Sequence, residues 1–132
     1  MPLAQCKFNE GASLHAIEQL RANYPHLADD YLSFLLKSDG GEGSVGISPG
    51  YFQIWRASEV ARFSTEYELP KYLPDYVAIG SDGGGDLYVF PISGNPPGLF
   101  IVPAIGMEAR YVELVAPTFS HFVSQFGKQW HA

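Results

Sequence analysis

The chain has 132 residues, one cysteine and a formal net charge of −6, and 46% of its residues are hydrophobic. This composition excludes a disordered chain, because so large an apolar fraction can bury enough surface to offset the entropy lost on folding. A single cysteine cannot form an internal disulfide, so we expect a protein that needs no oxidising compartment and resides in the cytoplasm. The length fits one domain over residues 1–132, with residues 1–12 as a tail.

The negative charge is concentrated in the middle of the chain. Residues 39–86 contain eight acidic residues against three basic ones, a net charge of −5. Such a field repels phosphate backbones and attracts cations, so we expect no binding to nucleic acid and a protein partner with a basic surface. The alternative, that the acidic composition only maintains solubility, stays open. We also expect no membrane contact, since no apolar run is long enough to span a bilayer.

Two helices are predicted in the N-terminal third. Ser13 suits an N-cap, and the apolar residues after it keep helical spacing as far as Leu20. A second helix begins near Leu27, carries Asp29 in its first turn and ends at the glycine pair 40–41. The short connection between them predicts a helical hairpin.

The rest of the chain alternates between strand and helix signals. A middle helix is predicted over residues 58–67, ended by Pro70, and a last helix runs from Pro117 to a cap at Gly127. Pro91 indicates an edge position for its strand. The candidate strands share β-branched and aromatic residues and lie at 45–47, 51–55, 76–79, 87–92, 99–102 and 110–115.

This order of elements predicts the α+β class. Short hairpin links favour an antiparallel sheet of about five to six strands, with the N-terminal helical hairpin, the middle helix and the C-terminal helix packed on one side. The glycine segment 41–46, GEGSVG, follows a helix and precedes a strand, which is the reverse of a dinucleotide-binding fingerprint. We therefore interpret it as a helix end and an entry to the sheet.

The segment IGSDGGGDLYVF, residues 79–90, holds three glycines between Asp82 and Asp86. Two carboxylates are fewer than a dedicated calcium loop uses, whereas glycine and aspartate are typical of a turn between strands. The turn interpretation is favoured, and a cation-binding or small-molecule-binding regulatory domain remains the alternative.

Catalytic and metal-binding patterns are not apparent. The four histidines lack zinc-ligand spacing, and no nucleophile elbow occurs, so we predict no catalytic residue, no metal, no cofactor and no enzyme. A hydrolase with dispersed residues is the weakest alternative. The aromatic and acidic residues that suit an interface are the predicted partner-binding residues: Asp39, Glu42, Tyr51, Trp55, Glu59, Asp82, Asp86 and Tyr88.

Several segments, in order, resemble the SUKH superfamily. They are YPHL at 24–27, YLSFLL at 31–36, GGEG at 40–43, YFQIW at 51–55, IGSDGGGD at 79–86 and TFSHF at 118–122. The resemblance spans residues 24–127. It implies an α+β fold with an antiparallel sheet and a non-catalytic protein-binding role, often that of a bacterial immunity protein that neutralises a cognate toxin. Fungal relatives regulate cell-wall synthesis through protein contacts, so a regulator of that kind is a second alternative.

Overall fold

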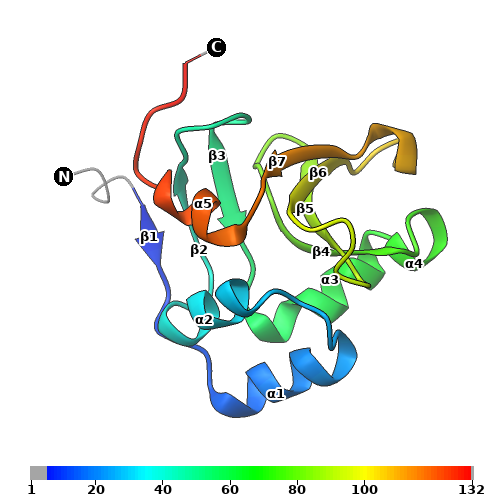
Figure 1. Cartoon of the computed structure of the whole chain (residues 1–132), viewed down its shortest axis with the longest axis horizontal. Coiled ribbons are helices and arrows are strands. Elements are labelled where there is room, and N and C mark those ends of the chain that lie inside the picture. The colour runs from blue at the N-terminus through cyan, green and yellow to red at the C-terminus, as the bar shows by residue number, and fades with distance from the viewer. Residues whose placement is uncertain (1–5, 132) are drawn as a thin grey trace.

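The computed structural model describes residues 6–131 and has an α+β fold around one curled antiparallel sheet (Figure 1). Seven strands lie in the sheet in the order in which they occur in the chain. The predicted class is confirmed, with seven strands in place of five or six. The strands are β1 (Lys7–Phe8), β2 (Gly41–Ser44), β3 (Tyr51–Ile54), β4 (Tyr76–Ser81), β5 (Asp86–Pro91), β6 (Leu99–Pro103) and β7 (Glu113–Ala116).

The helices are α1 (Leu14–Asn23), α2 (Asp29–Lys37), α3 (Val60–Glu66), α4 (Leu69–Tyr72) and α5 (Phe119–Ser124), with 3-10 turns at Ala57–Glu59 and Ala109–Tyr111. The Ser13 hydroxyl accepts a hydrogen bond from the Ala16 amide at 3.1 Å, which confirms the predicted N-cap. Helices α1 and α2 contact each other as the predicted hairpin, and both lie below the sheet in Figure 1.

The first two strands differ from the sequence prediction. Residues 7 and 8, expected in a tail, form β1 and pair with residues 42 and 41 of β2, while residues 1–5 of that tail lie outside the described part. Strand β2 occupies residues 41–44 instead of 45–47. Its glycines permit this close pairing, because a Cβ on Gly43 would lie 2.5 Å from the Cys6 sulfur.

Two prolines also act differently from the prediction. Pro70 lies in the first turn of α4, where its missing N–H leaves no helical hydrogen bond unmade. Pro91 does not mark an edge strand, because β5 lies between β4 and β6. It is the last residue of β5, so its missing N–H lies at the end of the strand and not in the middle of the hydrogen-bonded sheet.

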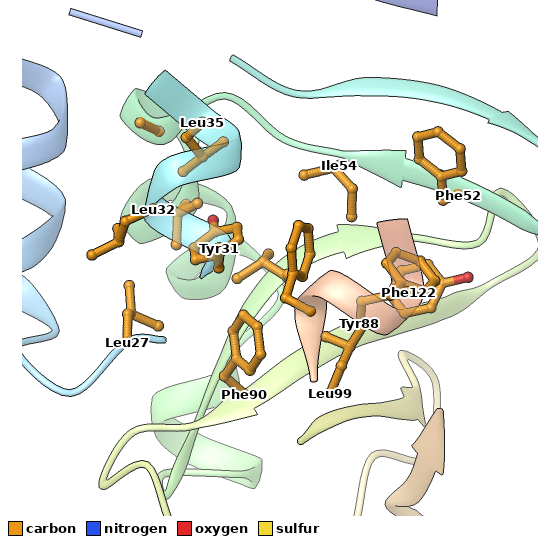
Figure 2. Close-up of a cluster of buried hydrophobic side chains, with 14 of the residues drawn as sticks. Leu27, Tyr31, Leu32, Leu35, Phe52, Ile54, Tyr88, Phe90, Leu99 and Phe122 are labelled. Atoms are coloured by element: carbon orange, nitrogen blue, oxygen red, sulfur yellow. The ribbon is translucent and has the colours of Figure 1, made fainter. Parts of the chain in front are cut away.

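The main core lies between one face of the sheet and helices α1, α2 and α5. Figure 2 shows aromatic and aliphatic side chains from the sheet, α2 and α5 converging there, with Tyr31, Phe90 and Phe122 among them. The rings of Phe52 and Phe126 stack with centroids 3.8 Å apart and planes 9° apart. Burying a side chain of this size contributes about 1.5–3 kcal/mol, so this cluster provides much of the stability of the fold.

The opposite face of the sheet has its own apolar cluster. It consists of Leu69 of α4 and Leu73, the residue that follows α4, packed with the strand residues Leu87, Val89 and Val102. The fold therefore covers both faces of the central strands, which differs from the expectation that all helices lie on one side. This second layer positions the surface between α3, α4 and the 104–108 loop.

Candidate functional site

The glycine-rich segment between β4 and β5 is a turn built by one aspartate. The Asp82 Oδ1 accepts hydrogen bonds from the Gly84 amide at 2.8 Å and from the Asp86 amide at 3.0 Å. Gly83 and Gly85 have φ values of 78° and 108°, which glycine adopts without strain. The predicted turn is confirmed, and the Asp82 carboxylate is its structural centre.

Tyr51 joins this turn to strand β2. Its hydroxyl donates a hydrogen bond to Glu42 Oε2 at 2.5 Å. Its ring lies against the turn, since a Cβ on Gly83 would be 3.3 Å from Tyr51 Cδ2. The Tyr88 hydroxyl donates a hydrogen bond to the Tyr51 carbonyl oxygen at 2.6 Å. Glu42, Tyr51 and the turn therefore form one connected surface.

Tyr88 supports this surface from inside the protein. Its side chain has 0% exposure and packs on Phe122, with ring centroids 5.0 Å apart. Burial raises the pKa of Tyr88, with further contributions from Asp82 and Asp86. A side chain this buried cannot contact a partner, so Tyr88 positions Tyr51 and contributes no contact surface of its own.

Asp86 lies beside a residue that the sequence did not indicate. Partial burial raises the pKa of Asp86, and the neighbouring carboxylates of Asp82 and Glu113 raise it further. Asp86, Glu113, Tyr111 and Pro103 line a hollow of about 140 Å³. Glu113 was missed because it reaches this position through the pairing of β6 with β7, which no local sequence pattern reveals.

We call Glu42, Asp82, Asp86 and Glu113 the acidic rim. Within residues 6–131, ion pairs join Arg62 with Glu59 and Glu66, and Arg110 with Glu108, and none of them involves the rim. None of the four rim carboxylates makes an ion pair within residues 6–131, and the nearest basic residue by sheet register is Lys7, opposite Glu42. Such a surface attracts cations over a range of about 8–10 Å at physiological ionic strength.

Asp39 and Glu59, also predicted to bind a partner, support the backbone. Asp39 Oδ1 accepts a hydrogen bond from the Ala57 amide at 2.7 Å. Glu59 Oε1 accepts one from the Arg56 amide at 2.9 Å. Both side chains hold the 3-10 turn before α3, and neither belongs to the acidic rim.

Trp55 lies at the other end of β3 from Tyr51. Its ring stacks on Tyr67 with centroids 5.8 Å apart and planes 5° apart, and it meets Phe63 edge-on at 5.0 Å. Trp55 therefore belongs to a second, aromatic surface on α3. Trp55 is one of the predicted partner-binding residues, whereas the helical spacing of Phe63 and Tyr67 is also typical of a core-facing side of a helix, so neither is among them.

Neither a metal-ligand cluster nor a membrane-spanning helix occurs in the described part of the chain. Among residues 6–131, no group of three or more His, Cys, Asp or Glu side chains is arranged to hold a metal ion. In the same range, no helix has the length and apolar character that crossing a bilayer requires.

A family model described as the SMI1 / KNR4 family (SUKH-1) matches residues 11–125 of the chain. A comparison with curated proteins finds no match. The matched region begins before the resemblance at residue 24 and takes in all of α1, together with every later helix and strand. With most of its length matched, the chain belongs to the SMI1 / KNR4 family (SUKH-1).

Proposed function

We propose that this protein is a non-catalytic binding module, an immunity protein that neutralises a cognate toxin in the cytoplasm. Membership of the SUKH family is consistent with an immunity-protein-like or regulatory role. The observation that carries the proposal is the acidic rim, whose four carboxylates make no ion pair within residues 6–131. The toxin surface that it contacts is basic, such as the substrate-binding site of a nuclease.

The rim is held in place before any partner arrives. Two amide hydrogen bonds fix the Asp82 carboxylate, and the Tyr51 hydroxyl fixes Glu42. Because these side chains are already ordered, little conformational entropy is lost when they bind. Complementary charge also accelerates association, and added salt weakens that effect.

Asp86 is the rim residue whose charge is least favourable in the free protein. The pKa of Asp86 is raised by partial burial and by the carboxylates of Asp82 and Glu113. Groups whose ionisation is disfavoured in the free state often lie at functional sites. A basic side chain placed beside Asp86 and Glu113 would relieve this repulsion, so binding and electrostatic relief reinforce each other.

The test is growth rescue in cells that express the toxin domain encoded immediately upstream. The rim variant combines Asp82→Asn, Asp86→Asn and Glu113→Gln, and asparagine at position 82 keeps an oxygen that can accept the turn hydrogen bonds. Exposed charge pairs contribute about 0.2–1 kcal/mol each, so the variant should bind the toxin roughly tenfold more weakly. Rescue should weaken accordingly.

A matched control removes three exposed carboxylates elsewhere, with Glu18→Gln, Asp29→Asn and Asp75→Asn. This control removes the same number of negative charges as the rim variant and should keep both affinity and rescue. Equal affinity of the rim variant and the control would contradict the role of the rim. Failure of the unmodified protein to bind any neighbouring toxin domain would contradict the immunity function and favour a regulator acting through other protein contacts.

A cation-binding regulatory function has weaker support. The Asp82 Oδ1 already accepts two amide hydrogen bonds, and residues 6–131 contain no group of ligands arranged for a metal. A ligand that binds only the folded state raises the melting temperature. Millimolar calcium should leave the melting temperature unchanged, and a clear rise would revive this alternative.

A further inference from the structure

A groove runs between α3, α4 and the loop that follows β6. One hollow of about 310 Å³ lies beside Trp55, Phe63 and Tyr67. A second, of about 490 Å³, lies beside Tyr67, Tyr72 and Met107. Tyr67 lines both, so the two hollows adjoin at its side chain. We call this surface, lined by Trp55, Phe63, Tyr67, Glu68, Tyr72 and Met107, the aromatic groove.

The groove exposes more aromatic surface than packing requires. The side chains of Tyr67 and Tyr72 are 43% and 49% exposed, although α4 buries Leu69 and Leu73 beside them. Trp55 stacks on Tyr67, which holds the ring of Tyr67 in a fixed orientation. Fixed, half-exposed aromatic rings are typical of positions that bind a partner.

Acidic side chains line the groove, and two basic ones flank it. Among the described residues, its lining includes the carboxylates of Glu66, Glu68 and Glu108, while Arg62 and Lys71 lie beside its rings. Glu66 pairs with Arg62 at 3.5 Å, and Glu108 pairs with Arg110 at 2.9 Å. Glu68 makes no ion pair within residues 6–131, so one carboxylate beside two tyrosine rings has no cation of its own.

The rings around the groove already hold cations of this chain. The Arg62 guanidinium lies 4.7 Å from the centre of the Phe63 ring, and the Lys71 ammonium lies 5.0 Å from that of Tyr72. Attraction between a cation and an aromatic face accounts for both contacts. Phe63 and Tyr72 therefore already hold a cation of this chain, whereas Tyr67 carries none among the described residues.

The backbone at Glu68 points in the same direction. Glu68 has φ 63° and ψ 32°, and among residues 6–131 it is the only non-glycine residue with a positive φ. Glycine adopts this conformation without steric cost, whereas glutamate does not. A glutamate at a position whose backbone conformation suits glycine is consistent with a function for its carboxylate.

We propose that the aromatic groove binds an arginine or lysine side chain of a protein partner. The Glu68 carboxylate accepts its hydrogen bonds, and Tyr67 contributes a ring face. This inference rests on the proposed function in one respect, that the partner is a protein with a basic surface. It adds a second contact, formed by α3, α4 and the 104–108 loop, to the contact made by the acidic rim.

The test uses a tetra-arginine peptide as the probe and Trp55 fluorescence as the signal. The chain has two tryptophans, so a Trp130→Phe background leaves Trp55 as the only reporter. The peptide should change this fluorescence saturably, and tetra-glutamate should not. In the same background, Glu68→Gln and Glu68→Gly should each weaken peptide binding by about threefold or more.

Melting temperatures separate lost binding from lost folding. Glu68→Gly should melt at the same or a higher temperature, because glycine relieves the positive φ. Asp29→Asn is the matched control, which removes one exposed carboxylate outside both surfaces and should leave the Trp55 titration unchanged. Unaltered peptide affinity in both Glu68 variants, or an equal loss in Asp29→Asn, would overturn the groove. Neither result bears on rescue by the rim, so the two proposals fail separately.

Discussion

Replacing Tyr31 with phenylalanine should stabilise the protein. The Tyr31 side chain is fully buried, and its ring centroid lies 5.2 Å from those of Phe90 and Phe119 (Figure 2). Its hydroxyl has no hydrogen-bond partner within residues 6–131. Phenylalanine keeps every ring contact and removes the one polar atom that the folded protein leaves unpaired.

The size of the effect follows from the cost of the buried hydroxyl. An unpaired buried donor costs about 1–3 kcal/mol relative to water. Removing the oxygen also leaves a small cavity, which offsets part of the stabilisation. We therefore expect the free energy of unfolding to rise by about 1 kcal/mol, near the lower end of this range. For a chain of this length, that gain corresponds to a rise in melting temperature of roughly 3–5 °C.

The gain should also depend on pH. Burial raises the pKa of Tyr31 above its ordinary value of 10.0, and Asp39 raises it further. The unfolded chain therefore releases this proton at lower pH than the folded protein. Below pH 10 the Tyr31 hydroxyl stays protonated in both the folded and the unfolded protein, so it adds no pH dependence. Above pH 10 its ionisation in the unfolded chain lowers the free energy of unfolding of the wild-type protein, and the variant lacks this loss. The advantage of Tyr31→Phe should therefore grow above pH 10.

Urea unfolding followed by circular dichroism measures both effects, at pH 7 and again above pH 10. Tyr111→Phe is a suitable control, since Tyr111 is exposed and its hydroxyl makes no hydrogen bond within residues 6–131. This control should change the free energy of unfolding by less than about 0.5 kcal/mol. A loss of stability in Tyr31→Phe would refute the reasoning, because the hydroxyl would then contribute favourably to folding.

Three further predictions follow from individual contacts. The pKa of Asp86 is raised above 3.8, so folding disfavours its charged form. The melting temperature of Asp86→Asn should therefore exceed that of the wild type at pH 7. This difference should vanish below pH 3.8, where Asp86 is protonated in both states. Ser64→Ala should cost about 1–3 kcal/mol in urea unfolding, since its buried hydroxyl bonds both the amide and the carbonyl of Ala78. Phe126→Ala should cost about 3–5 kcal/mol by removing the ring stacked on Phe52, whereas the exposed Leu114→Ala should cost little.

Local chemistry made much of the fold predictable. The helix from Asp29, the strand over residues 51–54 and the turn at Asp82 each depend on residues that are neighbours in the sequence. Strand β1 could not be predicted in this way, because two residues become a strand only when the glycines of β2 accept them as a partner. The short helix α4 was missed because Pro70 reads as a helix end unless the first turn begins just before it.

The candidate sites were predictable only in part for the same reason. Asp82 and Asp86 stand four residues apart in one turn, so their proximity is visible in the sequence. Glu113 reaches Asp86 through the register of β6 and β7. Tyr67 and Tyr72 meet the 104–108 loop through the packing of α4 on the far face of the sheet. Contacts between distant segments depend on sheet register, which single-sequence patterns do not encode.

The acidic rim and the aromatic groove adjoin along the segment after β6. Pro103 lines the hollow beside Asp86, and the next residue, Ala104, lines the groove. We expect one partner to contact both surfaces. No hydrogen bond or ion pair joins Asp86 and Glu68 within residues 6–131, so Asp86→Asn and Glu68→Gly should reduce toxin affinity additively. Titration calorimetry of the two single variants and the double variant measures this. If the double variant binds the toxin as tightly as the single variant of lower affinity, the two surfaces do not act as independent contacts with the same partner.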